Sequence, residues 1–376
     1  MGRILSTCLL KSVDCANADQ TLQGVRSICL DIDCHTEFPL IREAIQQVTN
    51  GESLSQEQMT EVVDDIMQGN CKASAISSLL VGLHEKGESV EELAGAATAM
   101  RKHMTPINSK RETLIDTCGT GGGMSGTFNI STAAAIVAAS AGASVAKHGN
   151  KKSTSKTGSA DVLKALGVNI ECSVETVEKC LDQLGLCFCF APLFHPSVKH
   201  VTNVRKKLKH PTIFNLLGPL CNPAGAQFQV LGAGRSETRE TIAKALALIG
   251  TERSIVIHSR DGLGEISTGG TTDVSEIIGK QVRTAELAPK DFGIEESPVA
   301  MLKVNNPTES ADAIRRIFDG HAGARRDIVV MNAAAALWVA GICDGLAIAV
   351  ERCQTAIDNK QAKHMLSELV ELTNKG

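Results

Sequence analysis

Hydrophobic positions between Pro39 and about Met104 repeat with the period of an α-helix. The first such face is formed by five residues, Leu40, Ile41, Ala44, Ile45 and Val48. A second helix is expected after Ser55, because Gln58 stands in the capping-box position. Two more are expected over Ala73–Glu85 and Ser89–Met104. No stretch here has the pattern of a strand, so the pattern predicts a small all-helical unit that ends near Pro106.

The periodicity changes after Pro106. Short β-prone runs now alternate with helical stretches that end at Gly142 and Gly167. The strands expected from these runs are Thr113–Asp116, Ser144–Ala146, Val168–Ile170, Gln227–Leu231 and Ser254–His258. The later helices expected are Thr238–Ile249, Asp327–Gly341 and Gly345 to about Thr373. Such alternation predicts βαβ units, and the fold class is therefore α/β, with a small helical unit before a mainly parallel central sheet flanked by helices.

Composition narrows the classes of function. The 376 residues carry a net charge of −4, so no global positive field attracts nucleic acid, and one Trp with no Tyr leaves few rings for stacking bases. No apolar run reaches the roughly 18 residues of a membrane helix. The 13 cysteines are scattered and contain no CxxC pair, which favours reduced thiols in a cytoplasmic protein. Residues 1–37 are expected to be a disordered extension or the result of a misassigned start, and acidic residues such as Asp14 argue against a transit peptide.

A glycine-rich turn, Gly119-Thr-Gly-Gly-Gly123, follows the first predicted strand. Ligands of open α/β sheets bind at the carboxyl ends of strands, where bare backbone N–H groups and a helix N-terminus can hold a phosphate. Four polar residues then open the next helix: Thr127, Asn129, Ser131 and Thr132. A lone glycine turn needs no ligand and one or two of these residues could simply cap the helix, but four exceed what a cap requires.

A second loop of the same kind runs from Lys147 to Gly158, KHGNKKSTSKTG, before a helix that opens at Ser159. Lysines and hydroxyls at a helix N-terminus suit a ligand with several negative charges. Lys147, His148 and Asn150 stand at the strand end, where a functional role is favoured. Three further lysines, Lys151, Lys152 and Lys156, fit a lid or a mobile basic surface loop equally well.

Three other segments offer chemistry. In Asp261–Ser267, DGLGEIS, the carboxylates of Asp261 and Glu265 are oxygen ligands suited to Mg²⁺ on a pyrophosphate, although a polar turn would look alike. Ile213–Pro219 is an apolar run that could wall a planar aromatic ligand or only fill the core. The basic segment His195–Pro211 is expected to be helical, and its lysines could merely be a solvated face.

Together these segments resemble the anthranilate phosphoribosyltransferase family. The resemblance runs from about Leu40 to the C-terminus and depends on five ordered motifs: GTGGx₄TFNIST, KHGNx₇GSADVLKALGV, HPx₈R, FNLLGPLxNP and DGLxEIS. It implies transfer of the phosphoribosyl group of 5-phosphoribosyl-1-pyrophosphate to the amine of anthranilate, with Mg²⁺ as cofactor. It implies a homodimer, and a helical domain of residues 38–106 that is joined by 195–210. Residues 107–194 and 211–376 would form the α/β domain.

The resemblance also implies roles for named residues. Those expected to bind phosphoribosyl pyrophosphate are Gly119, Thr120, Gly121, Gly122, Thr127, Asn129, Ser131, Thr132, Lys147 and Ser159. Those expected along the anthranilate path are Gly119, His148, Asn150, His195, Arg205 and Gly218. Mg²⁺ is expected at Ser131 and Glu265, with Asp261 as a further candidate. Lys147 would act electrostatically, stabilising the leaving pyrophosphate.

Three positions depart from the family pattern. Gly123 and Gly264 stand where the family usually has acidic residues, and Pro211 stands where a basic residue is common. The hypothesis is an enzyme with an altered Mg²⁺ dependence. Two alternatives stay open: a nucleoside phosphorylase of the related pyrimidine class, and a non-catalytic relative that kept the fold and uses its basic cleft to bind nucleic acid.

Overall fold

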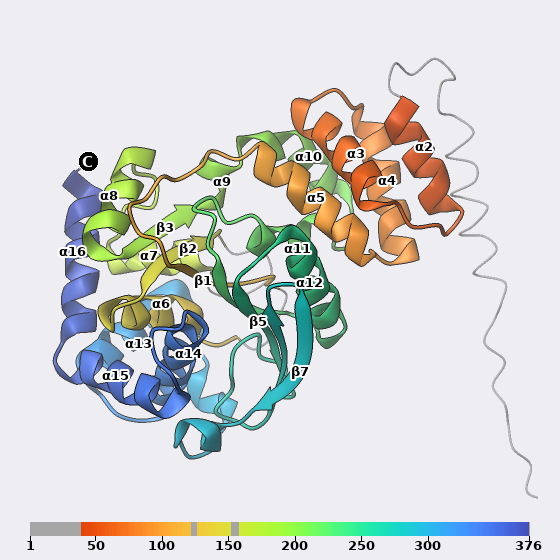
Figure 1. Cartoon of the computed structure of the whole chain (residues 1–376). Coiled ribbons are helices and arrows are strands. Elements are labelled where there is room, and N and C mark those ends of the chain that lie inside the picture. Colours follow the sequence, from red (N-terminus) through yellow and green to blue (C-terminus); the bar gives the residue numbers. More distant parts are fainter. Residues whose placement is uncertain (1–38, 122–125, 152–157, 376) are drawn as a thin grey trace, which may run out of the picture. The chain divides into compact units, whose positions relative to one another are not determined.

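The computed structural model describes residues 39–121, 126–151 and 158–375, and the structural statements below concern these residues. The described part of the chain begins with four helices, α2 (Pro39–Thr49), α3 (Gln56–Gln68), α4 (Ala73–Lys86) and α5 (Val90–Lys102), drawn in red to orange in Figure 1. Ser55 caps α3 in a capping box with Gln58, as predicted, and the helix ends at Gly69 in the left-handed conformation. The expected extension of residues 1–37 lies outside the described residues.

A single sheet is built from seven strands within the described residues, in the order β3-β2-β1-β4-β5-β6-β7. The strands are β1 (Leu114–Gly119), β2 (Ser144–Gly149), β3 (Leu186–Phe190), β4 (Phe228–Gly232), β5 (Arg253–Ser259), β6 (Thr272–Ile278) and β7 (Gln281–Leu287). The pairs from β3 to β5 are parallel, whereas β6 and β7 form an antiparallel hairpin at one edge. The predicted α/β class with a mainly parallel sheet is confirmed.

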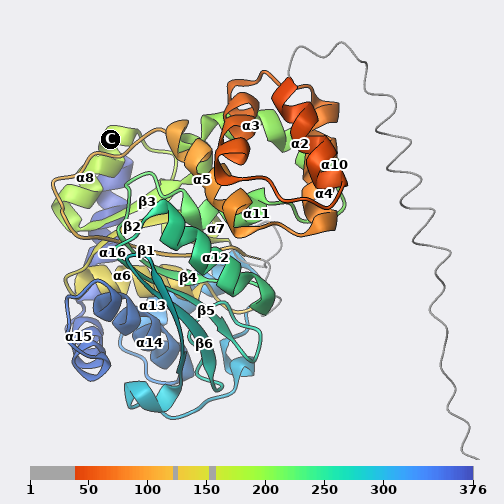
Figure 2. The ribbon, with the colours of Figure 1, turned by 45° about the vertical axis from the view of Figure 1, so that its right-hand side comes forward.

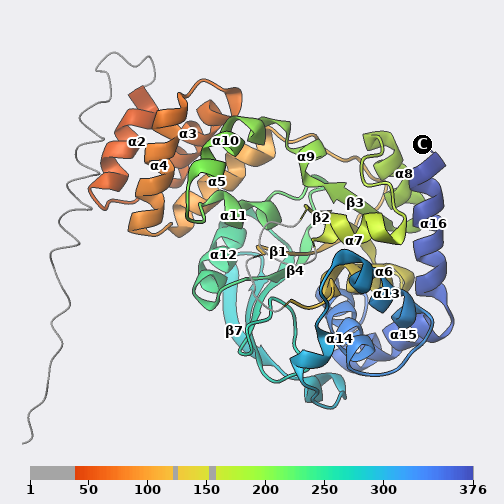
Figure 3. The same cartoon turned by 180° about the vertical axis from the view of Figure 1, so that it is seen from behind.

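Strand order reverses between β1 and β4. From β1 the chain proceeds through α6 (Ile130–Ser140) to β2, and from β4 it proceeds through α12 (Ser236–Ile249) to β5, in opposite directions across the sheet. Right-handed crossovers therefore place α6 and α12 on opposite faces, as Figures 2 and 3 show. The carboxyl ends of β1 and β4 form the switch point at which such sheets bind ligands.

Helices cover both faces of this sheet. The remaining longer ones are α7 (Ser159–Leu166), α8 (Val174–Leu184), α13 (Pro307–Phe318), α14 (Ala324–Val339), α15 (Leu346–Asp358) and α16 (Gln361–Lys375). Alanine-rich stretches make α6 and α14 thin enough to pack closely together in the main hydrophobic core. No described helix is long and apolar enough to cross a membrane.

The segment of residues 191–220 leaves the sheet and packs against the helical bundle. After α9 (Ala191–Phe194), α10 (Lys199–Lys207) packs against α3 and α4, and α11 (Phe214–Leu217) contacts α5. Short 3₁₀ turns lie at Pro196–Val198, Gly218–Leu220, Pro289–Phe292 and Val299–Leu302. The Arg101 Nε–H of α5 donates to the Leu220 carbonyl at 2.7 Å, which ties the bundle to the segment after α11.

Two secondary-structure predictions were wrong. Val168–Ile170 forms no strand: both apolar residues are buried in the turn between α7 and α8, and the segment pairs with none of the seven strands. The helix expected from Gly345 to Thr373 is two helices, because Lys360 adopts a left-handed φ of 61° between α15 and α16. Helical periodicity continues across this break, so hydrophobic spacing does not reveal it.

Candidate active site

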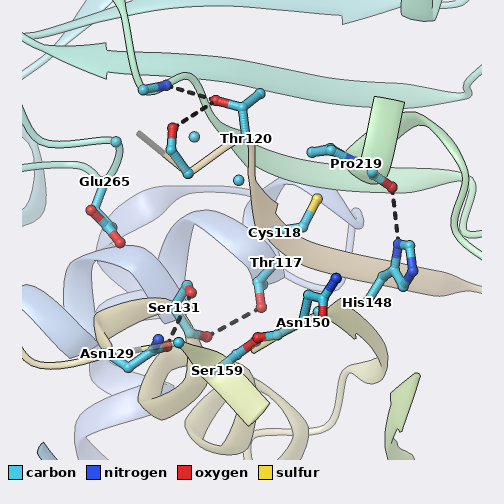
Figure 4. A pocket seen from close by; sticks show the side chains of 18 of the residues that line it. Thr117, Cys118, Thr120, Asn129, Ser131, His148, Asn150, Ser159, Pro219 and Glu265 are labelled. Carbon is cyan, nitrogen blue, oxygen red and sulfur yellow. Dashed lines mark hydrogen bonds between the residues drawn. The ribbon is translucent and has the colours of Figure 1, made fainter. Parts of the chain in front are cut away.

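A cavity of about 610 Å³ opens at the carboxyl ends of β1, β2 and β4, and α10 and α11 contribute to its wall. Figure 4 shows Glu265 toward one side of this cavity and His148 toward the other, with Thr117 and Ser131 between them. The candidate residues that line it are Gly119, Thr120, Gly121, Thr127, Asn129, Ser131, Lys147, His148, Asn150, Ser159, Arg205, Gly218 and Glu265. Most of the predicted site is thus brought together, although its segments are far apart in the sequence.

The first glycine loop is held against β4 by its own backbone and by Thr120. The Thr120 N–H donates to the Gly232 carbonyl, and the Gly234 N–H donates to the Thr120 hydroxyl, each at 2.9 Å. A Cβ on Gly119 would lie 3.0 Å from the Gly232 oxygen, so this position favours glycine. Gly121 has a φ of 68°, which also favours glycine. Gly122 and Gly123 lie outside the described residues.

The N-terminus of α6 faces the cavity with a capped first turn. Asn129 Oδ1 accepts the Thr132 N–H at 3.1 Å and the Ser131 hydroxyl at 3.4 Å. The Thr117 hydroxyl donates to the Ser131 carbonyl at 3.3 Å, which links this turn to β1. Thr132 is buried and does not line the cavity, so the structure does not bring its side chain together with the other predicted residues of this turn.

Lys147 places a buried cation at the end of β2. Its Nζ donates to the Thr117 carbonyl and, at 3.3 Å, to the Ser131 hydroxyl. Burial lowers the pKa of Lys147, while the nearby carboxylate of Asp116 raises it. Asp116 is itself fixed by the His148 N–H at 3.1 Å and by the Asn222 amide at 2.8 Å. The ammonium group is therefore held in position beside the first loop before any ligand arrives.

His148, which lines the cavity, and His195, which does not, form a neutral pair. His148 Nδ1 lies 2.9 Å from the Gly218 carbonyl, which can only accept, so Nδ1 carries the proton. His148 Nε2 then accepts from His195 Nε2 at 3.2 Å. Burial lowers the pKa of His148 to about 3 and that of His195 to about 4. His195 does not line the cavity, and it contributes by holding His148.

The opposite wall combines one cation with apolar surface. The half-buried Arg205 guanidinium lies 5.6 Å from the centre of the Phe214 ring, and Pro211, Phe214, Leu216 and Pro219 add apolar lining. No described carboxylate forms an ion pair with Arg205. At the second loop, the Ser159 hydroxyl donates to the Asn150 carbonyl at 3.4 Å, which closes the base of the loop. Lys152 and Lys156 lie outside the described residues, whereas Lys151 lines the cavity.

The oxygen donors of the site fit a hard divalent cation that is shared with a phosphate ligand. Glu265 lines the cavity, and burial raises its pKa to about 7 although Lys147 opposes the shift. The Ser131 hydroxyl lies on the same cavity. Asp261 instead accepts bonds from the Ser267 hydroxyl at 2.5 Å and the Leu263 N–H at 3.3 Å within its own turn, outside the cavity. No group of three or more His, Cys, Asp or Glu ligands occurs among the described residues, and Mg²⁺ bound through substrate phosphates needs none.

Comparison with known proteins decides the family. Residues 42–104 match the helical bundle domain, and residues 111–363 the a/b domain, of a glycosyl transferase family. The anthranilate phosphoribosyltransferase of Rhodopirellula baltica is 48% identical over 88% of this chain and 96% of its own length. The anthranilate phosphoribosyltransferase of Acetivibrio thermocellus is 44% identical over 89% of this chain and 97% of its own length.

Solved structures agree with these relatives. The anthranilate phosphoribosyltransferase of Thermus thermophilus matches with a TM-score of 0.83 and 38% identity, over 88% of this chain and 99% of its own. The anthranilate phosphoribosyltransferase of Saccharomyces cerevisiae in complex with PRPP and Mg matches with a TM-score of 0.83 and 27% identity. This match covers 91% of this chain and 100% of that chain. The chain belongs to the anthranilate phosphoribosyltransferase family.

Several residues that line the cavity of this anthranilate phosphoribosyltransferase family member were not predicted from the sequence. The cavity is also lined by Gly232, the last residue of β4, and by Gly234, Arg235 and Thr238 after it. Their segment, which includes LGAGRSE, has the same order of strand, glycine turn and helix as the first loop. That pattern could have identified them. Asn332 carries no such signal, because it lies within the apolar helix α14.

Asn332 nevertheless supports the predicted metal-binding segment. Its amide accepts the Ile266 N–H at 3.0 Å and donates to the carbonyls of Ile266 at 2.9 Å and Ile328 at 2.8 Å. These bonds fix the backbone immediately after Glu265. A buried amide that satisfies a loop backbone in this way is a tertiary contact that one sequence does not disclose.

Proposed function

We propose that this chain is an anthranilate phosphoribosyltransferase. It transfers the phosphoribosyl group of 5-phosphoribosyl-1-pyrophosphate to the amine of anthranilate and releases pyrophosphate, a step of tryptophan biosynthesis. The observation that carries the proposal is one cavity that joins two loops suited to phosphate with a wall suited to an aromatic carboxylate, in a chain 48% identical to a named relative.

The phosphoribosyl pyrophosphate half of the cavity lies at β1, β2 and α6. The glycine-rich backbone at Gly119–Gly121 and the N-terminus of α6 line this half of the cavity and suit the phosphates, although the Thr120 N–H itself is engaged by the Gly232 carbonyl. Thr127, Asn129, Ser131 and Ser159 add polar groups that line the same cavity. Lys147 stabilises the negative charge that develops on the leaving pyrophosphate, because its ammonium group is already fixed and partly desolvated.

The anthranilate half lies between His148, Asn150, Gly218 and Arg205. Arg205 pairs with the substrate carboxylate, and the apolar wall holds the ring. Both ring nitrogens of His148 are already engaged, with the Gly218 carbonyl and with His195. His148 therefore shapes and positions rather than accepts a proton, and the reaction depends mainly on the alignment of an amine that is already nucleophilic.

Mg²⁺ completes the phosphoribosyl pyrophosphate half. Ser131 and Glu265 would hold it, and it would supply charge neutralisation of the pyrophosphate. Glu265 must be ionised to bind a cation, and its backbone is held by the Asn332 amide. Gly264, next to it, adds no carboxylate to this part of the cavity, which supports an altered Mg²⁺ dependence.

The wider assignments are part of the same proposal. The helical domain comprises residues 38–106 joined by 195–210, which is supported by the packing of α10 on α3 and α4. Residues 107–194 and 211–376 form the phosphoribosyltransferase domain. The protein acts in the cytoplasm as a homodimer, as the family resemblance implies.

Anthranilate fluorescence tests the function. Mixing the protein with anthranilate, phosphoribosyl pyrophosphate and Mg²⁺ should cause a steady fluorescence loss that stops when either the phosphoribosyl donor or Mg²⁺ is omitted. Phosphorolysis of pyrimidine nucleosides, measured in parallel, should be absent. Nucleoside cleavage without fluorescence loss would replace the proposed function with that of a phosphorylase.

A further inference from the structure

Asn215, in α11, lies in the cavity wall beside Arg205. Its Oδ1 accepts from Arg205 Nη2 at 3.3 Å, from the Thr212 N–H at 2.9 Å and from the Thr212 hydroxyl at 3.4 Å. Arginine and a backbone N–H can only donate, so the amide must present its oxygen at this position. The orientation of the Asn215 side chain is therefore determined by its neighbours.

Arg205 depends on few other contacts. Its guanidinium lies over the Phe214 ring, with 5.6 Å from the Cζ atom to the ring centre, and no described carboxylate pairs with it. The flexible side chain of an arginine loses about 2 kcal/mol of rotamer entropy when it is fixed. One amide oxygen and one aromatic ring hold the group, and no hydrogen bond joins its other N–H groups to a described residue, so they can serve a ligand.

We propose that Asn215 is a positioning residue that sets the selectivity of the site for a carboxylate-bearing aromatic amine. It holds Arg205 with an uncharged oxygen, so the guanidinium keeps its full charge for the substrate carboxylate. An aspartate at this position would hold Arg205 equally well but cancel that charge, and a leucine would release the guanidinium. This inference rests on the proposed function and adds to it the reason why the carboxylate is recognised.

The test compares anthranilate with its uncharged amide, anthranilamide, as acceptors for the wild-type chain and for Asn215→Asp and Asn215→Leu. The ratio of kcat/KM for the two acceptors should fall about tenfold in each variant, the size expected for one hydrogen bond to a charged group. KM for phosphoribosyl pyrophosphate should stay unchanged. Thr212→Val, which removes only the hydroxyl that shares the same oxygen, should leave the ratio unchanged.

A double-mutant cycle separates positioning from a structural role. If Asn215 acts through Arg205, Asn215→Leu should not change the ratio further in an Arg205→Ala background. Equal losses with both acceptors, or an unchanged ratio in both Asn215 variants of an active enzyme, would overturn the inference while leaving the proposed function intact. Absence of anthranilate turnover by the wild-type chain would overturn the proposed function, and with it the acceptor named here.

Discussion

At the scale of single residues, the proposed reaction depends most on Lys147. Its ammonium group bonds the Thr117 carbonyl and the Ser131 hydroxyl in the cavity wall, and a buried fixed cation stabilises developing negative charge more strongly than a solvated one. The same contacts hold β1, β2 and α6 together at the site.

Lys147→Met keeps the unbranched apolar part of the side chain and removes the ammonium group. We expect kcat/KM for phosphoribosyl pyrophosphate to fall by about 10²–10³, the usual loss for one preorganised group facing transition-state charge. Lys164→Met, which removes an exposed lysine of α7 paired with Glu171 at 3.0 Å, is the matched control. Steady-state rates measured at varied donor concentration check this, and similar losses in both variants would contradict the role of Lys147.

A second prediction concerns Gly264, which lies next to Glu265 in the cavity wall. A Cβ here would lie 3.6 Å from the Ala233 oxygen, an ordinary contact, so the backbone accepts a side chain. Gly264→Asp should lower the Mg²⁺ concentration for half-maximal rate by about 3–10-fold, because carboxylate count tunes the affinity of such sites. Gly264→Ala adds the Cβ alone and should not shift it. Equal Mg²⁺ curves for both variants would remove the hypothesis of an altered metal site.

Several of these residues were predicted from the sequence because they directly follow predicted strands. Lys147, His148 and Asn150 were found in this way. Asn215 and Asn332 were missed as functional residues, since their importance comes from hydrogen bonds to partners that only the folded chain supplies. Arg205 was identified through the family resemblance, because a charge run alone does not separate it from the solvated lysines beside it.

At the scale of elements, the end of β4 lies against the turn that follows β5. The contact is so close that the β4 position, Gly232, has no room for a side chain. A Cβ on Gly232, the last residue of β4, would lie 1.9 Å from the Gly264 carbonyl oxygen. Both glycines line the cavity, so this contact limits how closely the predicted metal-binding segment can approach the end of β4.

Gly232→Ala should therefore lower the free energy of unfolding by about 1–3 kcal/mol, the usual effect of forcing extra volume into a packed site. Gly264→Ala, on the other side of the same contact, should cost less than about 1 kcal/mol, since its new Cβ meets only ordinary contacts. Urea denaturation of the two variants provides the comparison. A Gly232→Ala variant as stable as Gly264→Ala would contradict the close approach of the two turns.

Element prediction from sequence succeeded where periodicity and capping agreed, as in α3 with its Ser55 capping box. It failed for Val168–Ile170, whose alternating apolar residues fill a buried turn rather than pair with a strand. The antiparallel β6–β7 hairpin was also not anticipated. Pairing direction depends on partners elsewhere in the sheet, which local pattern does not specify.

At the scale of the whole molecule, the strand order reverses between β1 and β4, and the cavity opens at the carboxyl ends of these strands. Because of this topology, residues as far apart in the sequence as Thr117 and Asn332 line the same cavity. The fold class could be predicted because strands alternate with helices along the chain. The shape of the cavity could not, because it depends on the return of α10 and α11 to the bundle.

The buried histidine pair makes global stability depend on pH. The pKa of His148 is lowered to about 3 and that of His195 to about 4, against 6.5 for the unfolded chain. Below pH 6.5 the unfolded chain therefore binds protons that the folded chain does not, and stability falls as pH falls. Between pH 7 and pH 5 we expect a loss of about 1–2 kcal/mol per histidine.

Urea denaturation of the wild type and of His195→Gln at several pH values checks this. The difference in pH dependence between the two isolates the pair from other titrating groups. The variant should lose less stability than the wild type between pH 7 and pH 5. Parallel pH profiles would contradict the neutral, buried state of the pair.

The most direct test of the proposed function is identification of the products by mass spectrometry after the protein is incubated with anthranilate, phosphoribosyl pyrophosphate and Mg²⁺. We predict N-(5-phosphoribosyl)anthranilate and pyrophosphate in equal amounts, with both lost in Arg205→Ala and Lys147→Met to the extent that their rates fall. Unchanged anthranilate, or pyrophosphate released without the anthranilate product, would contradict the claim that this cavity joins the two substrates.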